Sequence, residues 1–381
     1  MHNNITKIVK LITSEIKTCQ DKKEKWAAFK RENAQELKDL LELNHTAFEN
    51  PGNLLGFDID DDRKLILLNY TGQAHNELHD VEDGWSMPLR EMRGLIYSFS
   101  EEEPVLVSRG FEKFFNFSEL PENSYESLTD KYGKEKYLVR EKADGHMIEY
   151  FVHNGELCAS TRGKFGTASS IEALDMFSIN DFNRINDQFN GNILSLVVEL
   201  VTKNTEVHVD YNGFETLYLL AAFDKQGNKL SLENLQEISS NNSGLFTMPK
   251  AQYMSLDEII NEVQNRDIEN CEGWVADFNG ELIKFKYIDY IGRMVNAKLS
   301  YKYIMNCIRS NRLDRMFYTL PEEIRVHAYE MVKEVKLNLE KAKVLKDHKV
   351  LYKMHSETEG SKSYFQTVCR LFYRESTNQG V

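Results

Sequence analysis

Proline is scarce in this chain, which has 6 prolines among 381 residues and no long glycine, serine or single-residue tract. That composition argues against a disordered, linker-rich protein. Hydrophobic residues make up 41% of the chain and aromatic residues 11%, which is ample material for a packed core. The length fits either one large domain or two domains of ordinary size.

Metal-binding and membrane-spanning patterns are also missing. The 5 cysteines are scattered with no C-x-x-C pair, so neither a zinc knuckle nor a disulfide framework is expected. The 10 histidines show no H-E-x-x-H or similar spacing. No apolar run approaches a membrane span, and the N-terminus lacks a signal-peptide core. We expect a soluble protein of the cytoplasm that has no membrane partner.

Charge is distributed unevenly along the chain. The net charge of -13 at first argues against nucleic-acid binding. Residues 287–381, however, carry 17 Lys and Arg against 11 Asp and Glu, whereas the residues before them are strongly acidic. A basic terminal region on an acidic body suits RNA binding by one module, and a solvated helical face rich in lysine explains the charge equally well.

The hydrophobic pattern predicts an α+β protein in three parts. Residues 1–53 form a helical N-terminal segment, because apolar residues recur at helical spacing from Ile5 to Ile12. Residues 54–288 contain short strand-like runs with turn punctuation. Residues 289–381 form a helical, basic C-terminal domain.

Helices are expected at three further places. Two are inserts in the strand-rich part, near residues 169–177 and 255–264. The third begins at Leu320-Pro321-Glu322-Glu323, where an early proline and first-turn acids favour a helix start, and it continues through 324–346.

An Asn-Gly pair predicts a two-residue hairpin turn at Asn154-Gly155. In the strands that flank this turn, the residue numbers of each pair of opposite residues sum to 309. Met147 then lies opposite Arg162, and Arg162 is expected beside the loop that follows Lys142.

A second hairpin is predicted at Asn279-Gly280. Its register places Lys284 opposite Val275 and Lys286 opposite Gly273. Because side chains alternate along a strand, the two lysines share one face and make a suitable wall for an anion site.

The segment Glu141-Lys142-Ala143-Asp144-Gly145 contains K-x-D-G, in which a lysine can attack the α-phosphate of a nucleoside triphosphate. The amine must be neutral to attack, and cationic neighbours such as Lys284 and Lys286 favour that form while binding the phosphate. Lys142 is the candidate nucleophile, although an exposed turn lysine would give the same local pattern.

Two acidic residues stand out after the nucleophile. Glu199 lies within an apolar strand, where a carboxylate needs a partner such as a ribose hydroxyl or a metal ion. Glu272 begins the second hairpin near Lys286 and could hold Mg²⁺ or Mn²⁺. Either residue could instead be an ordinary surface acid at a strand edge or end.

Two basic residues precede the nucleophile. Arg93 and Lys113 could bind the outer phosphates of a triphosphate, or could be ordinary surface residues. His146 and His208 are interpreted as local structural residues, and the aromatic run from Phe111 to Phe117 as core.

Together these residues resemble the ATP-dependent RNA ligase 1 family of bacteriophages, over about Tyr70 to Tyr287. The Glu112–Asn116 segment, E-K-F-F-N, is the most discriminating part. The other matching segments are Met92–Tyr97, Ser108–Gly110, Glu141–Gly145, Ser160–Gly163, Val198–Val201, Thr216–Asp224, Glu272–Val275 and Leu282–Lys286.

The resemblance implies that residues 54–288 are the adenylyltransferase (nucleotidyltransferase) domain, with antiparallel sheets around an ATP cleft, and that residues 289–381 are an RNA-specificity domain. It also implies a three-step reaction. Lys142 takes AMP from ATP, AMP passes to a 5′-phosphorylated RNA end, and a 3′-hydroxyl end then displaces AMP.

The resemblance also implies roles for individual residues. They are Arg93 and Lys113 on the triphosphate tail, Arg162 and Glu199 on the ribose, Val275 on adenine, Glu272 on the metal, Lys284 and Lys286 on the α-phosphate, and Glu141, Asp144 and Gly145 around the nucleophile.

The implied partners are RNA with 5′-phosphate and 3′-hydroxyl ends, including a cleaved tRNA, and a polynucleotide kinase/phosphatase that acts upstream. We expect a monomer, in the host cytoplasm if the protein is viral. Two alternatives stay open. One is another lysine nucleotidyltransferase, either a DNA ligase or a GTP-using capping enzyme, and the other is a non-catalytic protein that binds RNA ends.

Overall fold

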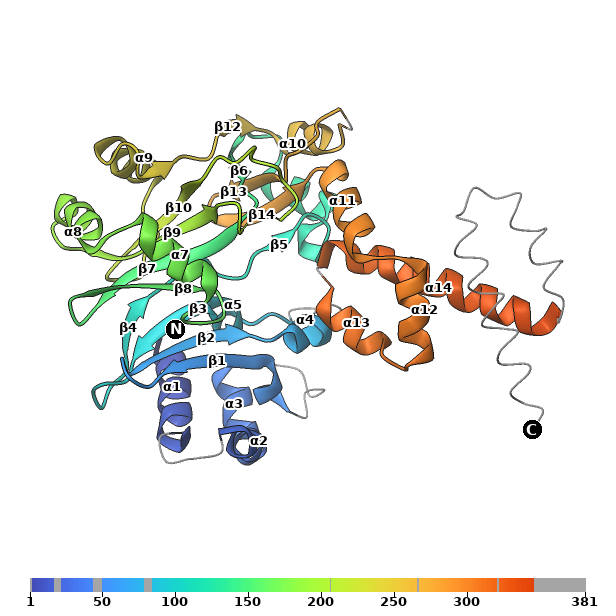
Figure 1. The fold of residues 1–381 in the computed structure, drawn as a ribbon, viewed down its shortest axis with the longest axis horizontal. Coiled ribbons are helices and arrows are strands. Elements are labelled where there is room, and N and C mark those ends of the chain that lie inside the picture. Colours follow the sequence, from blue (N-terminus) through green and yellow to red (C-terminus); the bar gives the residue numbers. More distant parts are fainter. Residues whose placement is uncertain are drawn as a thin grey trace. The chain divides into compact units, whose positions relative to one another are not determined.

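A computed structural model describes residues 2–16, 22–43, 50–78, 84–205, 207–265, 267–320 and 322–345 (Figure 1). The chain separates into two compact units, residues 1–290 and 291–381. The N-terminal helices belong to the first unit, and the finer boundaries expected at residues 53 and 288 stay predictions. Within the described parts, no helix is long and apolar enough to cross a membrane.

Three β-sheets form the body of the first unit (Figure 1). The first has the order β1-β2-β3-β4, the second β11-β10-β9-β7-β8 and the third β12-β6-β13-β14-β5. Neighbouring strands are antiparallel except for β10 with β11 and β14 with β5. The strands are β1 (Leu55–Asp60), β2 (Leu65–Tyr70), β3 (Arg93–Ser98), β4 (Val105–Ser108), β5 (Phe115–Asn116), β6 (Tyr137–Lys142), β7 (His146–His153), β8 (Glu156–Thr161), β9 (Ile193–Val201), β10 (Thr216–Asp224), β11 (Phe246–Thr247), β12 (Ala251–Met254), β13 (Gly273–Phe278) and β14 (Glu281–Lys286).

Helices border these sheets and make up the described part of the second unit from α11 onward. The expected α+β class with antiparallel sheets is confirmed, and so are the two helical inserts, now α7 and α10. The helices are α1 (His2–Ile16), α2 (Lys22–Glu32), α3 (Ala34–Leu40), α4 (Gly72–Leu78), α5 (Met87–Glu91), α6 (Tyr125–Tyr132), α7 (Ala168–Met176), α8 (Ile179–Gln188), α9 (Leu232–Asn241), α10 (Leu256–Val263), α11 (Ile288–Lys298), α12 (Tyr301–Arg309), α13 (Leu313–Thr319) and α14 (Glu322–Leu345), with 3₁₀ turns η1 (Pro51–Leu54) and η2 (Pro121–Asn123).

The first sheet packs on both of its faces, and β2 shows how. Ile66 and Leu68 share a core with Ile5 and Ile12 of α1, whereas the intervening Leu65 and Leu67 pack with residues of the second sheet. Side chains alternate along a strand, so one face of β2 meets the N-terminal helices and the other meets the second sheet. The N-terminal helices therefore complete a core that the sheets share. Each fully buried aliphatic side chain contributes about 1.5–3 kcal/mol to this packing.

Both predicted hairpins are confirmed. In the first, Ile148 pairs with Thr161, which fits the expected sum of 309. In the second, Val275 pairs with Lys284 and Gly273 with Lys286. The central residues of each turn all have positive φ, as two-residue hairpins of this type require. The lysine-bearing face is thus fixed by turn chemistry.

Glu149 on β7 is fully buried between the first and second sheets. Its Oε2 accepts a hydrogen bond from Ser108 Oγ at 2.8 Å, while Oε1 has no hydrogen-bond partner among the residues that the structure describes. A Cβ at position 110 would approach this oxygen to 2.3 Å, so a larger residue there would displace the Glu149 carboxylate. Burial raises the pKa of Glu149 to about 8, although the Ser108 hydrogen bond and the charge of Arg93 act in the opposite direction.

We predict that Glu149→Gln flattens the dependence of stability on pH. A carboxyl whose folded pKa lies above its unfolded value of 4.5 stabilises the fold fully below about pH 4.5. That contribution is lost as pH rises through about 8, whereas glutamine cannot ionise. The thermal midpoint of the variant, relative to wild type, should therefore increase between about pH 5 and about pH 9. Glu156→Gln, at an exposed position on β8, is the matched control. Parallel curves for Glu149→Gln and wild type would contradict the prediction.

Candidate active site

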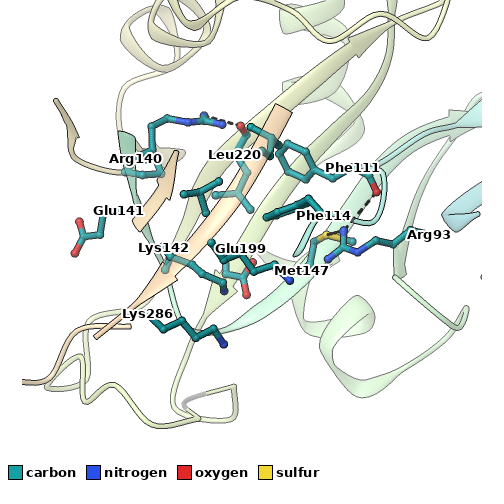
Figure 2. Close-up of a pocket in the computed structure, with 15 residues that line it drawn as sticks. Arg93, Phe111, Phe114, Arg140, Glu141, Lys142, Met147, Glu199, Leu220 and Lys286 are labelled. Carbon is teal, nitrogen blue, oxygen red and sulfur yellow. Dashed lines mark hydrogen bonds between the residues drawn. The ribbon is translucent and has the colours of Figure 1, made fainter. Parts of the chain in front are cut away.

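A cavity of about 210 Å³ opens between the second and third sheets of the first unit (Figure 2). Its lining combines five cationic side chains with aliphatic and aromatic ones. Seven of the predicted site residues line it: Arg93, Glu141, Lys142, Glu199, Val275, Lys284 and Lys286. The other lining residues are Phe111, Phe114, Arg140, Ala143, Met147, Leu220, Pro249 and Leu282.

Strand register explains why these residues meet. Gly273 of β13 pairs with Lys142 of β6 on one side and with Lys286 of β14 on the other. Two residues along the strands, Val275 pairs with both Arg140 and Lys284. The cavity wall of the third sheet thus carries two rows, each with a basic residue on either side of a small or apolar one.

Glu272 joins the two cations of the first row. Lys142 Nζ lies 2.9 Å from its Oε2, and Lys286 Nζ lies 3.0 Å from its Oε1. The side chain of Glu272 is 3% exposed, that of Lys286 8% and that of Lys142 23%. Removing one partner from so buried a cluster leaves an uncompensated charge, which is strongly destabilising. The cluster carries a formal charge of +1, which suits an anionic ligand.

Asp144 anchors the loop that follows Lys142. Its Oδ2 accepts hydrogen bonds from the backbone N–H groups of His208 and Val209 at 2.7 and 2.8 Å. Its Oδ1 accepts one from the Tyr290 hydroxyl at 2.8 Å. The carboxylate is buried, so these three bonds fix the backbone beside Lys142, the candidate nucleophile. Asp144 of the K-x-D-G motif therefore supports the loop and does not line the cavity.

Gly145 continues this loop at a point of close backbone approach. A Cβ there would lie 2.3 Å from the carbonyl oxygen of Leu200, so any other residue would push the loop off β9. The Gly145 N–H donates to Glu199 Oε1 at 3.2 Å. Burial raises the pKa of Glu199 to about 7, against the opposing charge of Lys142.

Arg93 and Lys284 both lie near the ring of Phe114. The guanidinium of Arg93 lies 5.7 Å from the Phe114 ring centroid, and Lys284 Nζ lies 4.8 Å from it. Arg93 also donates to the Phe111 carbonyl at 3.5 Å (Figure 2). Burial lowers the pKa of Arg93. The phenylalanines expected to be core therefore also form part of the cavity wall.

Arg140 is a cavity residue that the sequence reasoning missed. Its Nη1 donates to the Leu220 carbonyl at 2.8 Å (Figure 2), and burial lowers its pKa. A signal was available, because Arg140 precedes Lys142 by two residues and must share its face of the strand.

Lys113 and Arg162 are not brought to the cavity. Lys113 is 1% exposed, and its Nζ lies 4.4 Å from the Phe115 ring centroid and 3.7 Å from Glu119 Oε1. Arg162 donates to the Tyr70 hydroxyl at 3.2 Å. Neither residue lines this cavity, and their expected contacts with the nucleotide stay predictions.

The carboxylates near the cavity bear on whether it could hold a divalent metal ion. Among the described residues, no group of three or more His, Cys, Asp or Glu side chains could hold a metal. Mg²⁺ commonly uses one or two carboxylates together with waters and substrate phosphates. Glu272 and Glu199, two acids close enough to influence each other's ionisation, fit that kind of site.

We predict that Asp144→Ala destabilises the protein by about 2–4 kcal/mol, because three donors lose a buried charged acceptor. Urea unfolding followed by circular dichroism measures the change. Asp187→Ala removes an exposed carboxylate on α8 and should stay within about 0.5 kcal/mol of wild type. Equal stability of the two variants would show that Asp144 does not anchor the loop.

The sequence relatives agree on one family. The chain is 28% identical over 224 residues to RNA ligase 1 of bacteriophage TS2126, which covers 55% of this chain and 53% of that protein. It is 29% identical over 175 residues to a predicted bifunctional polynucleotide kinase/RNA ligase of Autographa californica nuclear polyhedrosis virus, covering 42% of this chain and 24% of the relative. The chain thus spans about half or less of the length of these relatives.

Among solved structures, an archaeal ATP-dependent RNA ligase matches with a TM-score of 0.45 at 16% identity, covering 73% of this chain and 74% of that one. A Naegleria gruberi RNA ligase with pyrophosphate matches with a TM-score of 0.37 at 15% identity, covering 48% and 56%. A family model described as RNA ligase matches residues 91–298, which is more than half of the chain. The chain therefore belongs to the RNA ligase family.

Proposed function

We propose that this protein is an ATP-dependent RNA ligase that joins 5′-phosphate and 3′-hydroxyl RNA ends through a lysyl-AMP intermediate. The observation that carries the proposal is the pair Lys142 and Lys286 on one buried carboxylate, at the wall of a cavity that also has further cations and apolar side chains. Family membership supports the same activity.

In the first step, Lys142 Nζ loses a proton and attacks the α-phosphorus of ATP. A P–N bond forms, the bond from the α-phosphorus to the bridging oxygen breaks, and pyrophosphate leaves with that oxygen. Lys284 and Lys286 offset the charge that develops on the α-phosphate oxygens. Arg93, which enters the cavity from the first sheet, is suited to the outer phosphates.

In the second step, a 5′-phosphate oxygen of RNA attacks the same phosphorus, the P–N bond breaks and Lys142 regains a proton. In the third step, a 3′-hydroxyl attacks the RNA 5′-phosphate, a phosphodiester forms and AMP leaves. The bonds of Asp144 and Gly145 hold the backbone beside Lys142 and so preserve its direction of attack.

The aliphatic surfaces of Val275 and Leu220 in the cavity wall are suited to the nucleobase. Glu199, which interacts with the charge of Lys142, is suited to hold the ribose. A bound Mg²⁺ or Mn²⁺ supplies Lewis-acid neutralisation of phosphate charge. Glu272, with Glu199 nearby, would hold it.

The RNA itself and the protein's surroundings are part of the proposal. A relative carries a polynucleotide kinase in its name, which supports an upstream enzyme that prepares 5′-phosphate and 3′-hydroxyl ends. A cleaved tRNA is a suitable substrate, with the protein acting as a monomer in the cytoplasm. The family match does not favour a DNA ligase or a capping enzyme. A non-catalytic RNA-end binding protein is not favoured either, because the chain retains Lys142, Glu199, Glu272, Lys284 and Lys286.

We predict that Lys142→Arg abolishes capture of AMP from ATP labelled at the α-phosphate. Arginine keeps the positive charge beside Glu272, so the fold and the ion pair are retained, but its guanidinium stays protonated and does not attack phosphorus. Denaturing electrophoresis after incubation with Mg²⁺ measures the protein-bound label. Labelled GTP, run in parallel, should leave little label on the wild-type protein.

Intact mass of the purified wild type shows beforehand whether it already carries AMP. Protein-bound label that persists in Lys142→Arg would sink the assignment of the nucleophile. Label from GTP in preference to ATP would instead favour a GTP-using nucleotidyltransferase.

A further inference from the structure

The second unit contains a cavity of about 370 Å³ that the proposed reaction does not use. It lies between α12 and α13, two consecutive helices joined by a short turn. Six residues line it, three from α12 and three from the turn and α13: Tyr303, Asn306, Cys307, Arg312, Arg315 and Met316.

The turn between the helices sets the geometry of the cavity. Asn311 has a φ of 50°, which reverses the chain in the left-handed region that asparagine tolerates. The Arg312 backbone N–H then donates to the Cys307 carbonyl at 2.8 Å, and its Nε donates to Ser310 Oγ at 2.8 Å. These two bonds connect Arg312 to the turn.

The floor and the rim of the cavity differ in chemistry. Cys307 and Met316 are buried and form an apolar floor. Tyr303 on the rim is 40% exposed, and Asn306 is exposed beside it. An exposed aromatic ring near an amide that can both donate and accept suits a flat heterocycle with polar edges.

Two arginines complete the rim. Arg312 and Arg315 are exposed, and no ion pair to either is seen among the described residues. The acidic neighbour Asp314 is exposed and does not line the cavity. Guanidinium groups match phosphate geometry, so this side of the cavity is suited to a phosphodiester.

We propose that this cavity binds one nucleotide of single-stranded RNA. The base stacks on Tyr303 with Asn306 at its edge, and the adjoining phosphate lies against Arg312 and Arg315. The proposal rests on the proposed function in taking RNA as the substrate. The excess of Lys and Arg in residues 287–381 also favours a negatively charged ligand.

The test uses the full-length protein and a fluorescently labelled, 5′-phosphorylated single-stranded RNA of mixed sequence. Fluorescence anisotropy gives the affinity over a series of salt concentrations. The Arg312→Ala/Arg315→Ala double variant should lower the slope of log affinity against log salt by about 1.4, since each single-strand phosphate contact contributes about 0.7. Tyr303→Ala should weaken binding about tenfold with the slope unchanged, because stacking is not a charge interaction.

A Lys333→Ala/Lys336→Ala double variant on α14 is the matched control, because it removes two exposed positive charges outside the cavity. Its slope should change less than that of the arginine variant. Equal slopes for the two double variants would show that only the overall positive charge matters, and would overturn the proposal. Unchanged affinity in Tyr303→Ala, or competition by an acidic peptide as strong as by unlabelled RNA, would overturn it too.

Thermal melts of every variant show whether loss of binding reflects loss of fold. If Tyr303→Ala melts early, Tyr303→Phe keeps the ring and should bind as wild type. Capture of AMP by wild-type protein without RNA tests the proposed function separately. Its failure would count against the ligase, whereas unaltered RNA binding in the variants would count against this cavity alone.

Discussion

The site depends on one buried carboxylate, that of Glu272. One of its oxygens lies 2.9 Å from Lys142 Nζ, and the other lies 3.0 Å from Lys286 Nζ. Two ammonium groups this close repel each other unless an anion lies between them. Glu272 supplies that anion and thereby holds the amine of Lys142, the proposed nucleophile, at the cavity wall.

Strand register makes this interaction available. Gly273 is the middle residue of the row formed by Lys142, Gly273 and Lys286, and Glu272 is its immediate neighbour along the chain. The Asn279-Gly280 turn fixes the register of β13 with β14. A slip of one residue would move both Lys284 and Lys286 to the opposite face of the sheet. The geometry of catalysis in this account therefore begins with a two-residue turn.

Much of this arrangement could be predicted from the sequence because it is local. The hairpin registers, the face shared by Lys284 and Lys286, and the loop after Lys142 all depend on turn residues and strand alternation. Contacts between distant segments could not be predicted in the same way. Lys113 fits the family pattern by position, yet its ammonium lies against Phe115 and Glu119. The core shared by α1 and the first sheet likewise depends on packing that no local pattern encodes. The starts of α8 and α9 are also predictable from the sequence, because each helix begins with a serine capping box.

The most direct test of the account is peptide mapping by mass spectrometry of the wild-type protein after incubation with ATP and Mg²⁺. The account predicts one adenylate adduct, on the peptide that contains Lys142, which is lost when 5′-phosphorylated RNA is added. An adduct on another residue, or one that RNA does not remove, would contradict it.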